Sequence, residues 1–178
     1  MGREQDTSGS APFGAASVGF TLSQLGFETS RRFGLLVGTL GLEPRQFAVL
    51  RAVQQEEGQS QQTVAEQLEI PPSTMVALVD ALEEHKMIER RMLGSDRRTR
   101  TLHLTPEGAG ILKRAMELAS RLEQTICEGI DRTERARLLH LLGRVAENLG
   151  VSRGSLPDKG SGERPPQLPA HGMEGKRR

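Results

Sequence analysis

Arginines gather in one short segment of this chain, between Glu89 and Leu104. Five arginines face only two carboxylates there, a local charge of +3 in a chain whose net charge is +1. Two short strand-like runs flank Asp96-Arg97-Arg98, so the segment is predicted to be a hairpin with these three residues at its turn. Guanidinium groups pair with phosphate oxygens. The pattern therefore indicates a hairpin that reaches into a groove of duplex DNA.

The charged side chains of this hairpin are expected to have different roles. Arg98 is predicted to enter a minor groove, where a narrow, A·T-rich sequence concentrates negative potential. Asp96 is predicted to hold Arg98 or the turn in shape through a charge-assisted bond, without touching DNA. Arg97 and Arg100 are expected to meet phosphates. For an arginine-rich loop taken alone, a solvated charged hairpin is the better interpretation, because charged side chains mostly lie on surfaces.

The residues before the hairpin follow a helix-turn-helix pattern. A short helix is predicted over residues 61–69 and a second from about Ser73 to Lys86, with a turn at Ile70-Pro71-Pro72 between them. A hairpin directly after such a unit makes the winged version. The residues predicted to face inward are Val64, Ala65, Leu68, Met75, Val79 and Leu82.

The second helix of this unit is poor in groups that read bases. It has no lysine or arginine between Ser73 and Glu84. Hydroxyls can bond either kind of base and small apolar groups can touch a thymine methyl, so shallow readout is expected. Simple packing is the alternative for Val76 and Ala77.

The helix before this one begins with Gln61 and Gln62. Their amide side chains are suited to phosphate contacts, and an ordinary polar surface at the start of a helix is the alternative. Arg90 and Arg91 alternate faces, so at most one should face DNA. The residues assigned to DNA are Gln61, Gln62, Ser73, Thr74, Val76, Ala77, Arg91, Arg97, Arg98 and Arg100.

Apolar stripes at helical spacing occupy both ends of the ordered part of the chain. The first runs from Val18 to Leu40, and another from Ile111 to Ile130 in a long helix that begins after Thr105. A last helix is expected after a capping box of Asp131 and Glu134, with a leucine stripe of its own. A compact winged unit needs little of this surface, so the stripes predict a two-fold homodimer.

The predicted fold is mainly α: a winged helix-turn-helix with terminal helices that form a dimerisation region. Residues 1–16 and 151–178 are rich in glycine, proline and polar residues and are expected to be disordered tails. Residues 17–150 form the domain. Within it, residues 17–42 and 106–150 are the dimerisation helices, and residues 43–105 are the DNA-binding lobe with its wing at residues 88–104.

Residues 17–149 resemble the MarR family (multiple antibiotic resistance type) of bacterial transcription regulators. The resemblance is carried by Leu42-Glu43-Pro44, Val64-Ala65-Glu66-Gln67-Leu68, Leu78-Val79-Asp80-Ala81-Leu82, Asp96-Arg97-Arg98 and Leu104-Thr105-Pro106-Glu107-Gly108. It implies a triangular dimer that places a recognition helix in a major groove and a wing in an adjacent minor groove. The site would be pseudo-palindromic, with half-sites about 34–36 Å apart if they lie one helical turn apart.

The chain departs from the family pattern at several positions. Glu43 stands where the family often has a threonine cap, and Glu69 where it often has a glycine at a helix end. Family members commonly carry threonine and then a basic residue where this chain has Val76 and Ala77, and often another basic residue at Ala81. The wing is therefore expected to supply most of the DNA affinity.

Several other classes of protein find no support in the sequence. No apolar run is long enough for a membrane span, and no secretory signal is visible. A single cysteine, Cys127, suits a reducing cytoplasm and is expected to be a small core residue. His85, His103 and His140 lie far apart in sequence, so no metal site and no cofactor are expected. Motifs of enzyme chemistry are missing, so the chain is not expected to be an enzyme.

The expected function is sequence-specific transcriptional regulation by a cytoplasmic homodimer on double-stranded DNA, with repression as the expected sign. The family resemblance implies release by a small phenolic or aromatic effector, with Phe27, Arg31, Phe33 and Phe47 as candidate pocket residues. The phenylalanines fit plain core packing better, and a regulator without an effector stays open. The alternative function is a winged-helix module for protein contacts that binds DNA weakly and without sequence preference.

Overall fold

The computed structural model describes the backbone of residues 17–93 and 96–151, and the side chains of residues 17–92 and 100–151. The two predicted tails, residues 1–16 and all but the first residue of 151–178, lie outside the described residues. Along the described chain the elements are α1 (Val18–Gly38), α2 (Pro44–Gln55), α3 (Gln61–Gln67), α4 (Pro72–Glu84), β1 (Ile88–Leu93), β2 (Asp96–Leu104), α5 (Pro106–Ile126) and α6 (Arg132–Asn148).

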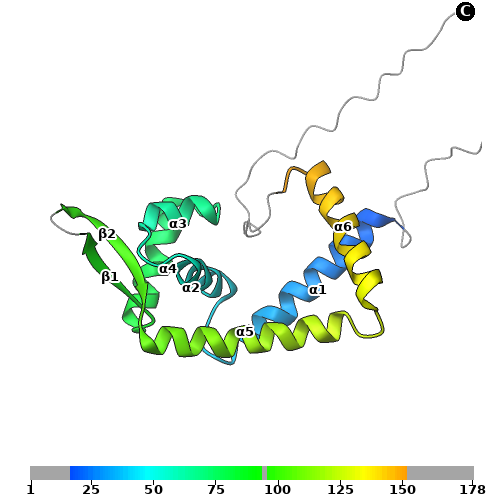
Figure 1. The fold of residues 1–178 in the computed structure, drawn as a ribbon, viewed down its shortest axis with the longest axis horizontal. Helices are drawn as coiled ribbons and strands as arrows, with labels where there is room; N and C mark the ends of the chain where they lie inside the picture. Colours follow the sequence, from blue (N-terminus) through cyan, green and yellow to red (C-terminus); the bar gives the residue numbers. More distant parts are fainter. Residues whose placement is uncertain (1–16, 94–95, 152–178) are drawn as a thin grey trace, which may run out of the picture.

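The elements form two regions joined by α5 (Figure 1). At one end, α2, α3 and α4 pack together with the hairpin of β1 and β2. From the base of this hairpin, α5 runs to the other end of the molecule, where α1 and α6 lie. Because α1 and α2 both contact α5, the long helix connects the two regions directly. This is the predicted mainly α, winged helix-turn-helix architecture.

Side-chain caps fix where several helices begin, as the sequence predicted. Thr105 Oγ1 accepts a hydrogen bond of 2.9 Å from the backbone N–H of Gly108 at the start of α5. Asp131 Oδ1 accepts from the N–H groups of Thr133 and Glu134 at 2.7 and 2.9 Å, and Glu134 Oε2 accepts from the N–H of Asp131 at 2.9 Å. Each cap satisfies backbone donors that have no partner inside the helix.

The hydrophobic core lies in the lobe formed by α2, α3, α4, the hairpin and the first half of α5. Every residue predicted to face inward from α3 and α4 is buried. One prediction for α5 needs correction, because this helix ends at Ile126 and Ile130 lies beyond it. The side of α5 that packs most tightly includes Leu112, which the predicted stripe through Ile111 missed. The fully buried residues of largest volume are Leu50, Met75, Leu82, Ile88, Leu102 and Leu112.

The hairpin is antiparallel, and its turn differs from the predicted one. Pairs run from Ile88↔Leu104 to Met92↔Arg100, and the register then shifts so that Leu93 pairs with Asp96. The prediction that Asp96-Arg97-Arg98 forms the turn is therefore wrong, because Asp96 already begins β2 and pairs with Leu93, the last residue of β1. Residues 97–99 have no counterpart on β1 at this shift, so β2 carries the irregularity.

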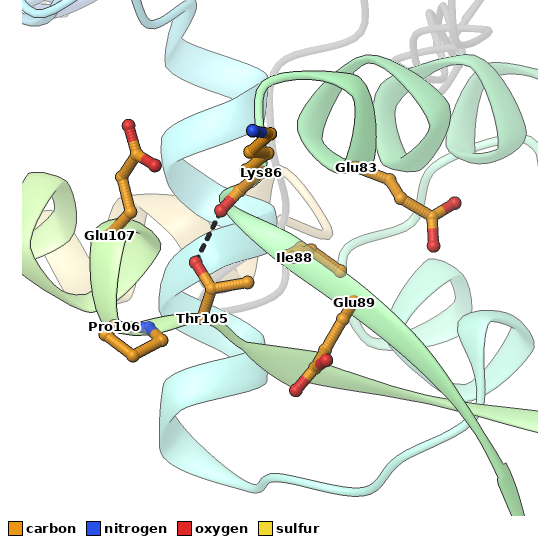
Figure 2. A pocket seen from close by; sticks show the side chains of 7 residues that line it. All are labelled: Glu83, Lys86, Ile88, Glu89, Thr105, Pro106 and Glu107. Atoms are coloured by element: carbon orange, nitrogen blue, oxygen red, sulfur yellow. Dashed lines mark hydrogen bonds between the residues drawn. The ribbon is translucent and has the colours of Figure 1, made fainter.

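A close backbone contact joins the start of α5, at Gly108, to Met87 just before the first strand of the wing. A Cβ atom at Gly108 would lie only 1.9 Å from the carbonyl oxygen of Met87, so only glycine fits there. Two hydrogen bonds hold the same junction: Thr105 N–H donates to Met87 O at 3.1 Å, and the Thr105 hydroxyl donates to Lys86 O. Figure 2 shows the hydrogen bond from Thr105 to Lys86 beside a shallow, open hollow lined by Glu83, Lys86, Ile88, Glu89, Thr105, Pro106 and Glu107.

The terminal helices expose much of their apolar surface. No residue of α6 is buried, and an ion pair between Arg135 and Glu123 links this helix to α5. On α1, Val37 is the one buried residue. The exposed large apolar residues of these two helices and the residues just after them are Val18, Leu25, Phe27, Leu35, Leu138, Leu139, Leu141, Leu142, Leu149 and Val151. Nowhere in residues 17–93 and 96–151 is a helix long and apolar enough to cross a membrane.

Candidate nucleic-acid interface

The outward face of α4 is made mainly of small side chains and carboxylates. Ser73, Val76 and Ala77 are exposed, with Val76 at 45%, so Val76 and Ala77 are not core residues in this chain. Thr74 is half-buried and precedes the buried Met75. At helical spacing, Asp80 continues the line of Val76 and Ala77. This face is shallow and carries no cation of its own.

The start of α3 lies beside the base of the wing. Ser60 caps this helix through a hydrogen bond of 3.1 Å from the N–H of Thr63. Gln61 is half-buried, and its side-chain oxygen accepts from Arg90 at 3.1 Å. Gln62 is exposed and donates to Glu66 at 2.9 Å. Both glutamines assigned to phosphate contact therefore have partners within the protein, but only the partner of Gln61 ties α3 to the hairpin.

Arg90 bonds to residues of both α3 and α4, a role that the sequence alone did not reveal. Its side chain is only 13% exposed, and its Nη2 lies 2.5 Å from Asp80 Oδ1 of α4. Its Nη1 donates to Glu83 of the same helix, and its backbone N–H donates to Glu83 Oε1 at 3.3 Å. Burial, the largest single influence, lowers the pKa of Arg90, but the bonds to Asp80 and Glu83 together raise it above its ordinary value. Arg90 is therefore a permanent cation held inside the unit.

Arg91 and Arg100 lie on the outer part of the wing. Arg91 is 57% exposed and pairs with Glu89 two residues before it on β1. Arg100 is exposed on β2 and lies opposite Met92, which is itself 65% exposed. Arg90 is covered and Arg91 is exposed, so the two side chains alternate; that at most one of them faces DNA stays a prediction. The side chains of Asp96, Arg97 and Arg98 lie outside the described residues, so their predicted roles stay predictions.

The candidate pocket residues are only partly brought together. Phe33 of α1 and Phe47 of α2 meet edge to face, with ring centroids 5.2 Å apart, and Phe47 belongs to the buried core. Phe27 is 73% exposed on α1. Arg31 donates two hydrogen bonds to Glu28, at 2.8 and 2.9 Å, so a ligand carboxylate would compete with Glu28 for it. This geometry supports core packing for Phe33 and Phe47, and it leaves Phe27 free for an interface.

Two of the departures from the family pattern have clear structural consequences. Glu43 begins α2 without a threonine cap, and the side-chain oxygen of Gln46 accepts from its backbone N–H at 2.9 Å. Glu69, after α3, adopts a left-handed backbone with φ of 53°, the conformation that glycine adopts most easily. A hydrogen bond of 2.9 Å from Ile70 N to Ala65 O closes the helix end there. The fold is therefore kept, at a local cost in backbone energy.

Cys127 is the cap residue at the end of α5. It is half-buried, and its Sγ lies 3.7 Å from Glu123 Oε1. It is a free thiol, and the group beside it is a carboxylate rather than a cation. The setting agrees with the expected small, partly packed residue.

A short helix, a turn, a second helix with an exposed face and a hairpin define the winged helix-turn-helix class of DNA-binding protein. Residues 40–99 match the model of the MarR family. A putative transcriptional regulatory protein for the hcr operon, from Thauera aromatica, is 30% identical over 132 residues, which cover 74% of this chain and 80% of the relative.

Solved structures agree with this assignment. The transcriptional repressor CouR, bound to a 23-mer DNA duplex, is 34% identical with a TM-score of 0.66, covering 73% of this chain and 92% of CouR. A MarR family transcriptional regulator from Rhodococcus sp. RHA1 is 30% identical with a TM-score of 0.61, covering 72% of this chain and 91% of that protein. The chain belongs to the MarR family. Its relatives are transcriptional regulators, not enzymes.

Proposed function

We propose that this protein is a homodimeric transcriptional repressor that binds a pseudo-palindromic operator in the cytoplasm. The observation that carries the proposal is the placement of the exposed face of α4 directly beside a wing with several arginines. CouR, which shares this fold at 34% identity, is a repressor with a DNA duplex bound. In the proposed complex α4 enters the major groove and the wing reaches an adjacent minor groove.

The proposed dimer interface consists of the exposed apolar residues of α1 and α6. Leu138, Leu141 and Leu142 lie close together on one side of α6, and between 38% and 46% of each remains exposed. Soluble monomers rarely leave contiguous apolar surface of this kind open. A second copy of the chain, related by a two-fold axis, covers the same patch on both protomers at once.

Release by a small aromatic or phenolic ligand completes the proposal. The proposed location, between the dimer helices and the winged lobe, is the one that the family resemblance implies; Phe33 of α1 and Phe47 of α2 meet at that boundary as part of the packed core. A regulator that responds to no ligand is the competing possibility. A screen of aromatic acids for compounds that release the protein from its operator separates the two.

Selection from a random DNA pool tests the proposed function. The wild-type protein is expected to enrich a palindrome whose half-sites fit one helical turn. In a mobility-shift assay at one stated salt concentration, Arg98→Ala is expected to weaken binding by roughly tenfold or more. Arg144→Ala, an exposed arginine of α6, is the matched control and should bind like the wild type. Equal binding by Arg98→Ala would refute the role assigned to the wing.

A second candidate function is favoured by one observation: α4 has no basic residue and exposes Asp80, Glu83 and Glu84. The candidate is a winged-helix module for protein contacts that binds DNA weakly. It predicts that the selection enriches no sequence and that binding depends steeply on salt without preference among duplexes.

A further inference from the structure

The helix proposed to enter the major groove is acidic. Between Pro72 and Glu84, α4 has three carboxylates, Asp80, Glu83 and Glu84, and no lysine or arginine. Their side chains are not withdrawn into the core, since 59% of the Asp80 side chain and 42% of the Glu83 side chain are exposed. Phosphates repel such a surface, so a helix of this composition needs a countercharge before it can approach DNA.

The countercharge comes from the first strand of the wing. One guanidinium group, that of Arg90, contacts Asp80 through Nη2 and Glu83 through Nη1. Because 87% of the Arg90 side chain is covered, this cation cannot also extend to a phosphate without leaving both carboxylates. Its position between the two acids is fixed further by Gln61 of α3 at 3.1 Å.

We infer that Arg90 is a positioning residue that makes the acidic helix α4 compatible with DNA. This inference rests on the proposed function. Arg90 offsets one of the two negative charges of Asp80 and Glu83 and at the same time ties α3, α4 and β1 into one unit. The planar guanidinium is suited to this, because its separate nitrogens reach three partners in fixed directions, whereas a lysine ammonium is a single point charge.

The test uses three full-length variants and two duplexes. The first variant, Arg90→Met, removes the cation and keeps much of its apolar stem. The second is a double variant, Asp80→Asn with Glu83→Gln, which removes the two acids. The third is a triple variant that combines all three changes. The probes are the duplex recovered by selection on the wild type and a scrambled duplex of the same composition. Affinity is measured at several salt concentrations, and thermal unfolding of each variant is followed by circular dichroism.

If Arg90 compensates the charge of the two acids, its removal should weaken DNA binding and removal of the acids should restore it. Arg90→Met should bind the selected duplex on the order of tenfold more weakly, because two carboxylates near the phosphates lose their countercharge. The triple variant should return to within about threefold of the wild type, since the acids that needed compensation are gone. The variant that lacks only the two acids should bind at least as tightly as the wild type.

Three results would overturn the inference while leaving the proposed function intact. One is a triple variant as weak as Arg90→Met, with the salt slope reduced by about one, because that slope marks a direct phosphate contact. Another is weaker binding when only the two acids are removed. The third is an affinity loss in Arg90→Met that disappears once its folded fraction is taken into account. A wild-type protein that binds neither duplex would overturn the proposed function, and this inference with it.

Discussion

Replacement of Gly108 by alanine is the sharpest test of how the wing is joined to the long helix. The added Cβ would lie 1.9 Å from the carbonyl oxygen of Met87, 2.7 Å from its carbonyl carbon and 3.0 Å from its Cα. All three atoms belong to the backbone, so no side-chain rotation relieves the clash. The start of α5 must retreat by about 1.5 Å to reach ordinary contact at 3.4 Å.

The loss of folding stability follows from the hydrogen bonds that break when α5 moves away. The bonds from Thr105 to Met87 O and Lys86 O contribute about 1 kcal/mol each. Strain from the extra methyl group adds about 1–3 kcal/mol, and the better helix propensity of alanine offsets at most about 1 kcal/mol. The free energy of unfolding should therefore fall by about 2–4 kcal/mol, which lowers Tm by roughly 6–15 °C in a domain of this size.

The assay is thermal and urea unfolding followed by far-ultraviolet circular dichroism, at one fixed protein concentration because the proposed dimerisation would affect apparent stability. Gly110→Ala is the matched control, two residues further along α5, where a Cβ would meet nothing within 4 Å. This control should be as stable as the wild type or more stable by up to about 1 kcal/mol. If Gly108→Ala and Gly110→Ala unfold together, the close contact described here is wrong.

Three further predictions concern other parts of the chain. Glu69→Gly should raise the free energy of unfolding by about 0.5–1 kcal/mol, because relief of the left-handed backbone exceeds the entropy that glycine costs; urea unfolding measures this, and a lower stability would contradict it. Hydrogen bonds from Arg31, and then from Arg32, lower the pKa of Glu28 from 4.5 to about 2. The stability from these pairs is therefore present above the ordinary carboxyl pKa and is lost as pH falls toward 2, and an NMR titration of Glu28 with a midpoint near 4.5 would disprove the pairing. Leu138→Glu should shift the protein from dimer to monomer in analytical ultracentrifugation, whereas His140→Glu, exposed on the side of α6 that faces away from Leu138 and Leu142, should not.

Local signals in the sequence predicted the elements well. Thr105 and Asp131 were identified as caps from their own residue types and those that follow, and both caps are present in the structure. Such signals act over three or four residues, so no tertiary contact is needed to read them.

What the sequence could not predict depends on contacts between distant residues. Arg90 meets Gln61 across 29 positions and Asp80 across 10, and no local pattern distinguishes it from Arg91. The turn of the hairpin was misplaced for a similar reason, since the register shift after Met92 depends on pairing between the strands. Leu112 was missed because α5 packs against both α1 and α2, which widens its buried face beyond a single stripe.

The length of α5 means that a small tilt at one end of this helix gives a large displacement at the other end. Its 21 residues span about 32 Å as one rod, from the wing junction at Gly108 to the region of α1 and α6 (Figure 1). A tilt of five degrees at one end of such a rod moves the other end by about 3 Å. In the proposed dimer two rods tilt together, so the distance between the recognition helices changes by up to about 6 Å against a helical repeat of about 34–36 Å. The tight packing at Gly108 would make the wing follow α5 instead of absorbing the tilt, so in the proposed dimer a slight rearrangement at the far end would become a loss of fit to the operator.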